Sequence, residues 1–245
     1  MPKKYGWMIP MYKNWKDKYI SLFIVLIAFV DGMLVAQQFQ SNGEGPLAGA
    51  LILEDKFEQK MSSIVEPEKP VQDLPFVVQA PYGVWSDPWA SFAEEATAYM
   101  AYLWANNLEA QGKEIDGQAL LEARDWELVN LETYKDTDLE QTLRLLNEFY
   151  RLRVELSYDV NLETMQAALD EGKILIIPIQ NLDNPYYGKP GPVSHMLIIY
   201  GYEEGTFLTN DPGTIRGDGY SYANQKILES IQDLNGEDRV IVVFP

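Results

Sequence analysis

The chain has no cysteine and a single histidine, His195. Without cysteine it can form neither disulfide bonds nor thiolate metal sites, and the redox state of its compartment stays open. One imidazole also excludes metal sites built from two or more histidines. We therefore expect a fold held together without covalent or metal cross-links, with no metal and no cofactor.

Positive charge is also scarce. The 245 residues include 19 Lys and Arg against 37 Asp and Glu, a formal net charge of −18. Residues 1–40 carry five lysines and two aspartates, a balance of +3, which leaves the remainder at −21. So acidic a surface repels phosphate groups, and we expect no nucleic-acid partner. An apolar content of 47% and an aromatic content of 12% predict a folded core.

One long apolar run lies near the N-terminus. Three lysines, at 13, 16 and 18, precede the apolar residues 19–30, and the run resumes over 33–36. Eighteen helical residues span about 27 Å, close to the ~30 Å hydrocarbon core of a bilayer. The lysines predict a cytoplasmic N-terminus, so residues 1–36 are interpreted as a single-pass membrane anchor with the rest of the chain extracytoplasmic. The alternatives are a cleaved signal peptide, which would make the protein secreted, and a soluble amphipathic helix. Asp31 argues against the membrane anchor, because a carboxylate in lipid is costly.

Residues 37–73 are rich in Gly, Pro and charge, which predicts a linker. The folded domain is expected over 74–245, with helices preceding an antiparallel sheet, an α+β class. Apolar periodicity predicts helices over 90–106, 118–129, after Asp138, 162–170 and 224–233. It predicts strands over 74–78, 153–156, 174–179, 195–202, 206–210 and 240–244.

The strands at 195–202 and 206–210 are joined by Glu-Glu-Gly at 203–205, a hairpin signal. If the turn centres between the two glutamates, opposed residues have numbers summing to about 407. His195 and Asp211 sum to 406, so we expect them to be neighbours across the hairpin. A histidine held by a carboxylate is half of a nucleophilic triad, because the carboxylate fixes the tautomer and stabilises the imidazolium. The missing half would be a thiol or hydroxyl at a helix N-terminus.

Three segments resemble a known family. QAPYGVWSDP at 79–88, followed by AEEA at 93–96, is similar to the start of C39-like cysteine peptidase domains, where close members read CEEA. GPVSHM at 191–196 resembles the segment that bears the family's histidine, and TNDPGTIRG at 209–217 the segment that bears its aspartate. The resemblance covers about residues 74–245, with the motifs in the family's order.

The resemblance implies a papain-like fold and hydrolysis of peptide bonds by a Cys/His/Asp triad. His195 would move the proton, Asp211 would orient it, and Gln79 would donate to the oxyanion. Tyr82, Trp85 and Ser194 are candidates for contacts with a peptide or protein substrate. Gln79 could instead bond only loop backbone groups, and Tyr82 and Trp85 could instead pin the loop.

Ala93 stands at the position of the nucleophile, and a methyl group cannot attack a carbonyl. Whether this chain is an enzyme is therefore open. Three explanations compete: a deliberate replacement of the cysteine, a natural pseudo-peptidase that binds a peptide or an envelope protein, and substitution of the nucleophile by Ser91. The neighbouring Glu94 and Glu95 are expected to be structural, with one of them bonding first-turn amides or pairing with Arg216.

Overall fold

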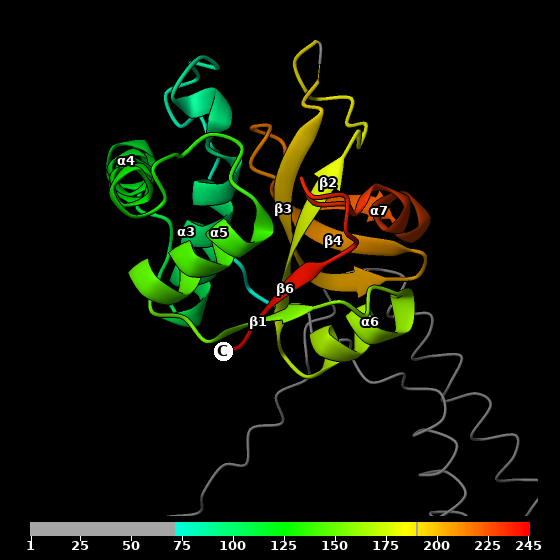
Figure 1. The fold of residues 1–245 in the computed structure, drawn as a ribbon. Helices are drawn as coiled ribbons and strands as arrows, with labels where there is room; N and C mark the ends of the chain where they lie inside the picture. The colour runs from blue at the N-terminus through cyan, green and yellow to red at the C-terminus, as the bar shows by residue number, and fades with distance from the viewer. Residues whose placement is uncertain (1–71, 190) are drawn as a thin grey trace, which may run out of the picture. The chain divides into compact units, whose positions relative to one another are not determined.

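A six-stranded antiparallel sheet forms the centre of residues 72–189 and 191–245, the part of the chain that the computed structural model describes (Figure 1). The strands lie in the order β1-β6-β2-β3-β4-β5, and each neighbouring pair is antiparallel. All described residues belong to one compact unit. The strands are β1 Val154–Ser157, β2 Ile174–Gln180, β3 Ser194–Glu203, β4 Thr206–Asn210, β5 Tyr220–Ala223 and β6 Val240–Val243.

Helices cover both faces of this sheet (Figure 1). On one face, α3 Ala93–Ala105 and α5 Leu139–Arg144, the latter continued by a π-helical turn, Leu145–Phe149, pack against the strands, and α4 Lys113–Asn130 packs on α3 and on that turn. The other face packs against α6 Leu162–Asp170 and α7 Asn224–Ser230. The class is α+β, as the order of predicted elements indicated.

The unbroken apolar run of β2 follows from this double cover. Ile174 and Ile176 join the core cluster that contains α3, whereas Leu175 and Ile177 join the cluster that contains α6 and α7. Successive side chains of a strand point to opposite faces, so a strand buried on both faces needs apolar residues at every position.

Local capping explains where two of the helices begin. Asp138 and Asn161 each accept a hydrogen bond from the backbone amide three residues on, and each closes a reciprocal capping box. The second of these opens α6, which spans the predicted residues 162–170. Gly172, with φ of +77°, follows its end and allows the chain to turn back.

Several predicted elements differ from those observed. Residues 74–78 form no strand; the segment is held by the Asn210 Nδ2 amide, which donates to the carbonyls of Leu74 (3.1 Å) and Pro75 (3.2 Å). The helix expected from residue 90 begins at Ala93, after a 3₁₀ turn over Trp89–Ser91. Helix α4 begins five residues before the predicted 118, and β5 was not predicted.

The hairpin between β3 and β4 turns one residue later than expected. Glu203 pairs with Thr206, so the turn lies at Glu204-Gly205, and the paired numbers sum to 409. A β-bulge between Ile199 and Gly201 then lowers the sum to 408 for the remaining pairs. The predicted sum of about 407 was therefore wrong.

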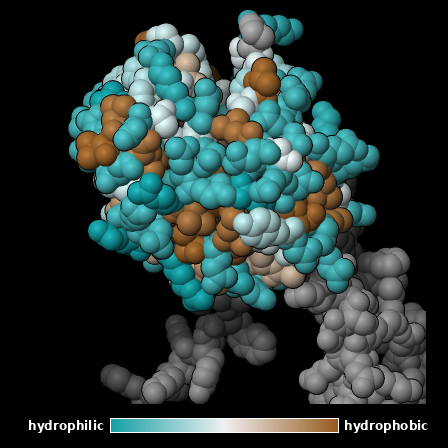
Figure 2. All heavy atoms as spheres, viewed as in Figure 1, coloured by the Kyte–Doolittle hydropathy of each residue, from teal (hydrophilic) through white to brown (hydrophobic). Residues whose placement is uncertain are grey.

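The predicted anchor at 1–36 and all but the last two residues of the predicted linker lie outside the described residues. Within 72–189 and 191–245, no helix is both long and apolar enough to cross a bilayer. The visible surface in the view of Figure 1 is mostly hydrophilic, with apolar side chains in separate clusters (Figure 2).

Candidate active site

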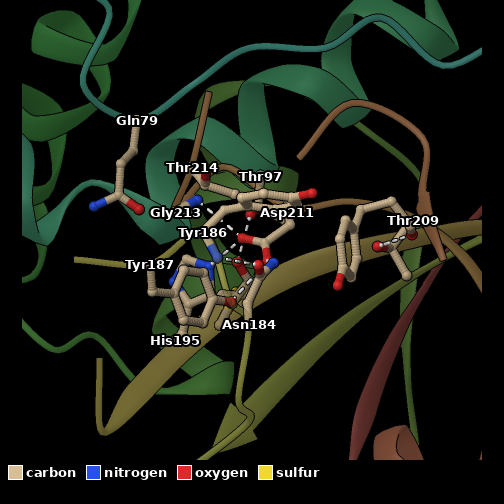
Figure 3. Close-up of polar contacts among 12 residues, drawn as sticks. Gln79, Thr97, Asn184, Tyr186, Tyr187, His195, Thr209, Asp211, Gly213 and Thr214 are labelled. Atoms are coloured by element: carbon tan, nitrogen blue, oxygen red, sulfur yellow. Dashed lines mark hydrogen bonds and ion pairs between the residues drawn. The ribbon is translucent and has the colours of Figure 1, made fainter. Parts of the chain in front are cut away.

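His195 and Asp211 form the centre of the site. The Nε2 atom of His195, the second residue of β3, lies 2.7 Å from Oδ1 of Asp211, the residue after β4 (Figure 3). Both side chains are buried, with exposed fractions of 6% for the histidine and 0% for the aspartate. An ionised carboxylate without solvent is stable only if it is paired or well supplied with donors.

The observed register explains how the two side chains meet. If the register of the last β3–β4 pairs continued, residue 213 and not residue 211 would lie opposite His195. Gly213 indeed lies against the imidazole, because a Cβ on it would sit 2.8 Å from Nε2. Asp211 thus lies two residues before the position directly opposite His195. That position is Gly213, which has no side chain to occupy the space of the imidazole.

Asp211 accepts hydrogen bonds from five donors. Oδ1 accepts from His195 and from the Gly213 amide (2.9 Å). Oδ2 accepts from the hydroxyls of Tyr222 (2.5 Å) and Tyr187 (2.7 Å) and from Asn184 Nδ2 (3.2 Å). These donors come from β3, from β5, from the loop before β3 and from the loop after β4.

The donors keep this buried carboxylate ionised. Burial by itself raises the pKa of Asp211, but His195 and the two tyrosine hydroxyls act against it, and the pKa falls to about 2. The same burial and the nearby negative charge raise the pKa values of Tyr187 and Tyr222 far above their ordinary range. Both hydroxyls are therefore protonated donors at neutral pH.

The pairing also fixes the chemistry of the imidazole. A carboxylate can only accept, so the neutral ring of His195 carries its proton on Nε2. The lone pair is then on Nδ1, which has no hydrogen-bond partner among the described residues. A proton acceptor at one ring nitrogen, with a carboxylate at the other, is the arrangement of a general base.

Ala93 is the first residue of α3, and it is buried. The Thr97 hydroxyl, one turn further along, donates to the carbonyl of Met196 at 3.4 Å, so this face of α3 lies on the start of β3 (Figure 3). Residues four apart share a helix face, so Ala93 lies on that same face, one turn nearer the N-terminus. The helix start and the start of the histidine strand are side by side, as a nucleophile and its base would require.

Three buried glutamates surround this helix start. Burial raises the pKa of Glu94 to about 7, partly offset by a backbone hydrogen bond and by the nearby His195. Glu95 and Glu127, from α3 and α4, are both fully buried, and no N–H or hydroxyl group of the described residues bonds any of their four oxygens. Burial raises the pKa of Glu127 to about 8, and burial together with the nearby charge of Glu127 raises the pKa of Glu95 well above its ordinary value. The expected pairing with Arg216 is wrong, because that guanidinium lies 4.7 Å from the ring centre of Tyr186 instead.

Gln79 is buried but is engaged elsewhere. Its Nε2 donates to the carbonyls of Trp89 and Ala90, both at 3.1 Å, and Figure 3 shows the side chain apart from His195 and Asp211. This is the loop-bonding arrangement given above as the alternative to an oxyanion donor. An oxyanion role would require the amide to leave both carbonyls.

The other predicted residues lie in the surrounding loops. Tyr82 packs edge-on against Trp89 at 5.3 Å and covers Gly117 of α4, an arrangement that pins the loop, whereas Trp85 is 45% exposed. Ser194 is half-buried, and its Oγ accepts from Gln180 Nε2 at 3.3 Å. Ser91 lies in the 3₁₀ turn before α3 and not on the helix itself.

The residues that the sequence did not reveal are the supports of Asp211. Tyr222 lies on the unpredicted strand β5, and Asn184 and Tyr187 lie in an irregular loop. No short-range spacing connects these residues to Asp211. The described residues contain no group of three or more potential His, Asp or Glu metal ligands.

No family model matches the sequence, and no curated protein matches it. Among solved structures, one from Bacillus anthracis, described as a "putative C39-like peptidase", matches with a TM-score of 0.49 and 12% sequence identity. The match covers 71% of this chain and 96% of that chain.

Proposed function

We propose that residues 74–245 form a C39-like peptidase domain of papain-like fold that is catalytically inactive in this chain because Ala93 stands at the nucleophile's position. The single observation that carries the proposal is the His195–Asp211 pair. The Asp211 carboxylate is buried and accepts from five donors, and Nδ1 of His195 has no hydrogen-bond partner among the described residues. His195 lies at the start of β3, which packs on the N-terminal end of the buried helix α3.

A cysteine at position 93 would complete the chemistry. The thiol would give its proton to Nδ1 of His195, and Asp211 would stabilise the imidazolium. The thiolate would attack the peptide carbonyl, and His195 would return the proton to the leaving amine. The backbone amide of residue 93, at the helix N-terminus, would donate to the oxyanion, with Gln79 as a second donor if its amide turned toward it.

Exposed apolar side chains favour peptide binding as the activity that remains without the nucleophile. The loop before α3 exposes Val84 and Trp85, the loop before β3 exposes Val193, and the loop after β4 exposes Ile215 at 72%. Gln79 and Pro212 bond each other through their backbones, which ties the first and third of these loops together. A rim of apolar loops around a polar site suits an extended peptide. A non-catalytic role in holding a peptide or an envelope protein is therefore the second candidate.

The location of the domain is part of the proposal. The apolar run at 19–36 and the lysines before it support a membrane anchor with the domain outside the cytoplasm, or a secreted protein if the segment is cleaved.

The test is to change Ala93→Cys in the full-length chain and to measure alkylation by iodoacetamide between pH 5 and pH 9. The cysteine would be the only one in the protein, so labelling is unambiguous. Fast labelling below pH 7 that His195→Ala abolishes would support the proposal, because an imidazolium stabilises the thiolate. Labelling with the pH profile of a free thiol, indifferent to His195→Ala, would overturn the peptidase site. Binding of a peptide library to the unmodified chain, lost on Trp85→Ala, would support the second candidate.

A further inference from the structure

The carboxylate oxygen of Asp211 that faces away from His195, Oδ2, is also fully hydrogen-bonded. Oδ2 is bonded by the hydroxyls of Tyr222 and Tyr187, and the two hydroxyl oxygens lie 3.4 Å apart. Asn184 donates to both Oδ2 and the Tyr222 hydroxyl, the latter at 2.7 Å. Its own Oδ1 accepts from the Tyr186 amide at 2.9 Å, which fixes the amide in this orientation.

These contacts determine where the carboxylate points. With Oδ2 held by three donors from two different segments, the plane of the carboxylate cannot rotate without breaking hydrogen bonds between buried groups, which is costly. Oδ1 is then left facing His195 and the Gly213 amide. Tyr187 also packs edge-on against the imidazole, with ring centres 5.6 Å apart, so one residue contacts both members of the pair.

The geometry points to Tyr187 and Tyr222, together with Asn184, which bonds both Tyr222 and Asp211, as positioning residues that hold Asp211 against His195. The inference rests on the proposed function, since it assigns these three residues a part in preparing the base of that same site. None of them would touch a substrate or the reacting atoms. They act through the carboxylate, in the way that a supporting group orients a catalytic one.

The alternative is that the hydroxyls merely satisfy a buried charge. Loss of either role would lower stability, so stability cannot distinguish them. The geometry of the His195–Asp211 hydrogen bond does distinguish them, because only positioning requires it to change. Besides the two tyrosines themselves, the titratable groups of the described residues that face the pair are Glu94, from the first turn of α3, and Tyr220.

His195 is the only histidine, so its ring N–H gives a single, unambiguous signal in the proton NMR spectrum of the full-length chain. We expect the Nε2–H proton to resonate strongly downfield and to exchange slowly with water, because it forms a short hydrogen bond to a buried carboxylate. The double change Tyr187→Phe with Tyr222→Phe should shift this resonance upfield and broaden it. Tyr220→Phe is the matched control: it lies on the same strand, its ring is 4.6 Å from that of Tyr222, and its hydroxyl does not bond Asp211.

A second measurement follows the consequence for reactivity. In the Ala93→Cys chain, the double tyrosine change should slow alkylation at pH 6 about tenfold, the effect of raising a thiol pKa by about one unit. Tyr220→Phe should leave the rate at that of the Ala93→Cys parent. Circular dichroism at the same temperature shows whether each variant is folded.

The outcomes separate the two ideas. If the resonance and the alkylation rate are unchanged in a folded double variant, the positioning role is wrong while the peptidase site stands. If the resonance responds to the tyrosines but Ala93→Cys is labelled independently of His195, the peptidase site is wrong while the positioning of the pair stands. If the double variant does not fold, the single changes Tyr222→Phe and Tyr187→Phe carry the same test, and an unmoved resonance in both overturns the inference.

Discussion

Asp211 and the Glu95–Glu127 pair are buried carboxyl groups in the two halves of one domain, and their surroundings are opposite. Asp211, at the edge of the sheet half, has five donors and a pKa lowered to about 2. The pair in the helical half is bonded by no N–H or hydroxyl group of the described residues, and burial raises its pKa values. Burial is nearly equal, so the supply of donors decides whether a buried acid is charged.

The difference suggests different uses. A carboxylate that stays charged at neutral pH can orient and stabilise an imidazolium, whereas two carboxyl groups that stay protonated carry no charge with which to do so. The two clusters also affect stability at opposite ends of the pH range. Asp211 stabilises the fold above its ordinary pKa of 3.8 and loses this contribution as the pH falls through about 2. Glu95 and Glu127 favour the fold while protonated, and that contribution is lost as the pH rises through about 8.

The largest effect is expected for Asp211→Ala. Removing the carboxylate strands the hydroxyls of Tyr187 and Tyr222, the Asn184 amide and the imidazole, which we expect to lower the free energy of unfolding by about 4 kcal/mol. Asp211→Asn keeps the shape of the side chain and one of its two acceptor oxygens, so it should cost less. Urea unfolding at pH 7 measures both; equal losses would mean that the donors do not depend on the charge.

The next effect is a pH dependence in the helical half. The free energy of unfolding should fall between pH 5 and pH 9, because the unfolded carboxyl groups release their protons near pH 4.5 whereas the folded pair keeps its protons until the pH approaches about 8. Glu127→Gln supplies an amide donor to Glu95 and should make the protein about 2 kcal/mol more stable than the parent at pH 9. Glu148→Gln, an exposed carboxylate paired with Arg144, is the control and should leave the slope unchanged. A parent whose stability is flat over this range would contradict the assignment.

A smaller effect is expected at Gly213, beside the charged cluster. A Cβ there would lie 2.8 Å from His195 Nε2 and 3.0 Å from the Tyr187 ring, so Gly213→Ala should displace the imidazole and cost about 1–2 kcal/mol. Gly188→Ala, where a Cβ would meet no atom within 4 Å, serves as the matched control. Thermal melts of the two variants test this, and identical melts would mean that the imidazole moves freely aside.

The smallest effect concerns an acid of the helical half that does have donors. Asp138 accepts from the Gln141 amide at 2.9 Å as the cap of α5. Asp138→Ala should cost about 1 kcal/mol, and Asp138→Asn much less, because asparagine also caps. Denaturant titration of the three proteins gives the result. A large loss for Asp138→Asn would show that charge, and not the hydrogen bond, matters at this cap.

The sequence placed the local features well. Capping residues, apolar periodicity and the hairpin located most helices and strands, and the spacing across the hairpin brought His195 close to Asp211. Prediction from the sequence failed where contacts between residues distant in the chain determine the structure. Residues 74–78 have the composition of a strand, yet they form none, and the Asn210 side chain donates hydrogen bonds to the carbonyls of Leu74 and Pro75. Tyr222, Asn184 and Tyr187 converge from segments that no short pattern links, so the surroundings of Asp211 could not be derived.

The bulge at Tyr200 has a consequence at a distance. It adds one residue to β3 five positions after His195, and so changes which residue of the opposite segment faces the imidazole. Had the pairing of the turn continued without it, Thr214 and not Gly213 would stand opposite His195, and its branched side chain would occupy the ring's place. Gain or loss of a single residue in that part of the hairpin would thus close the histidine's site while leaving every residue of the site itself unaltered.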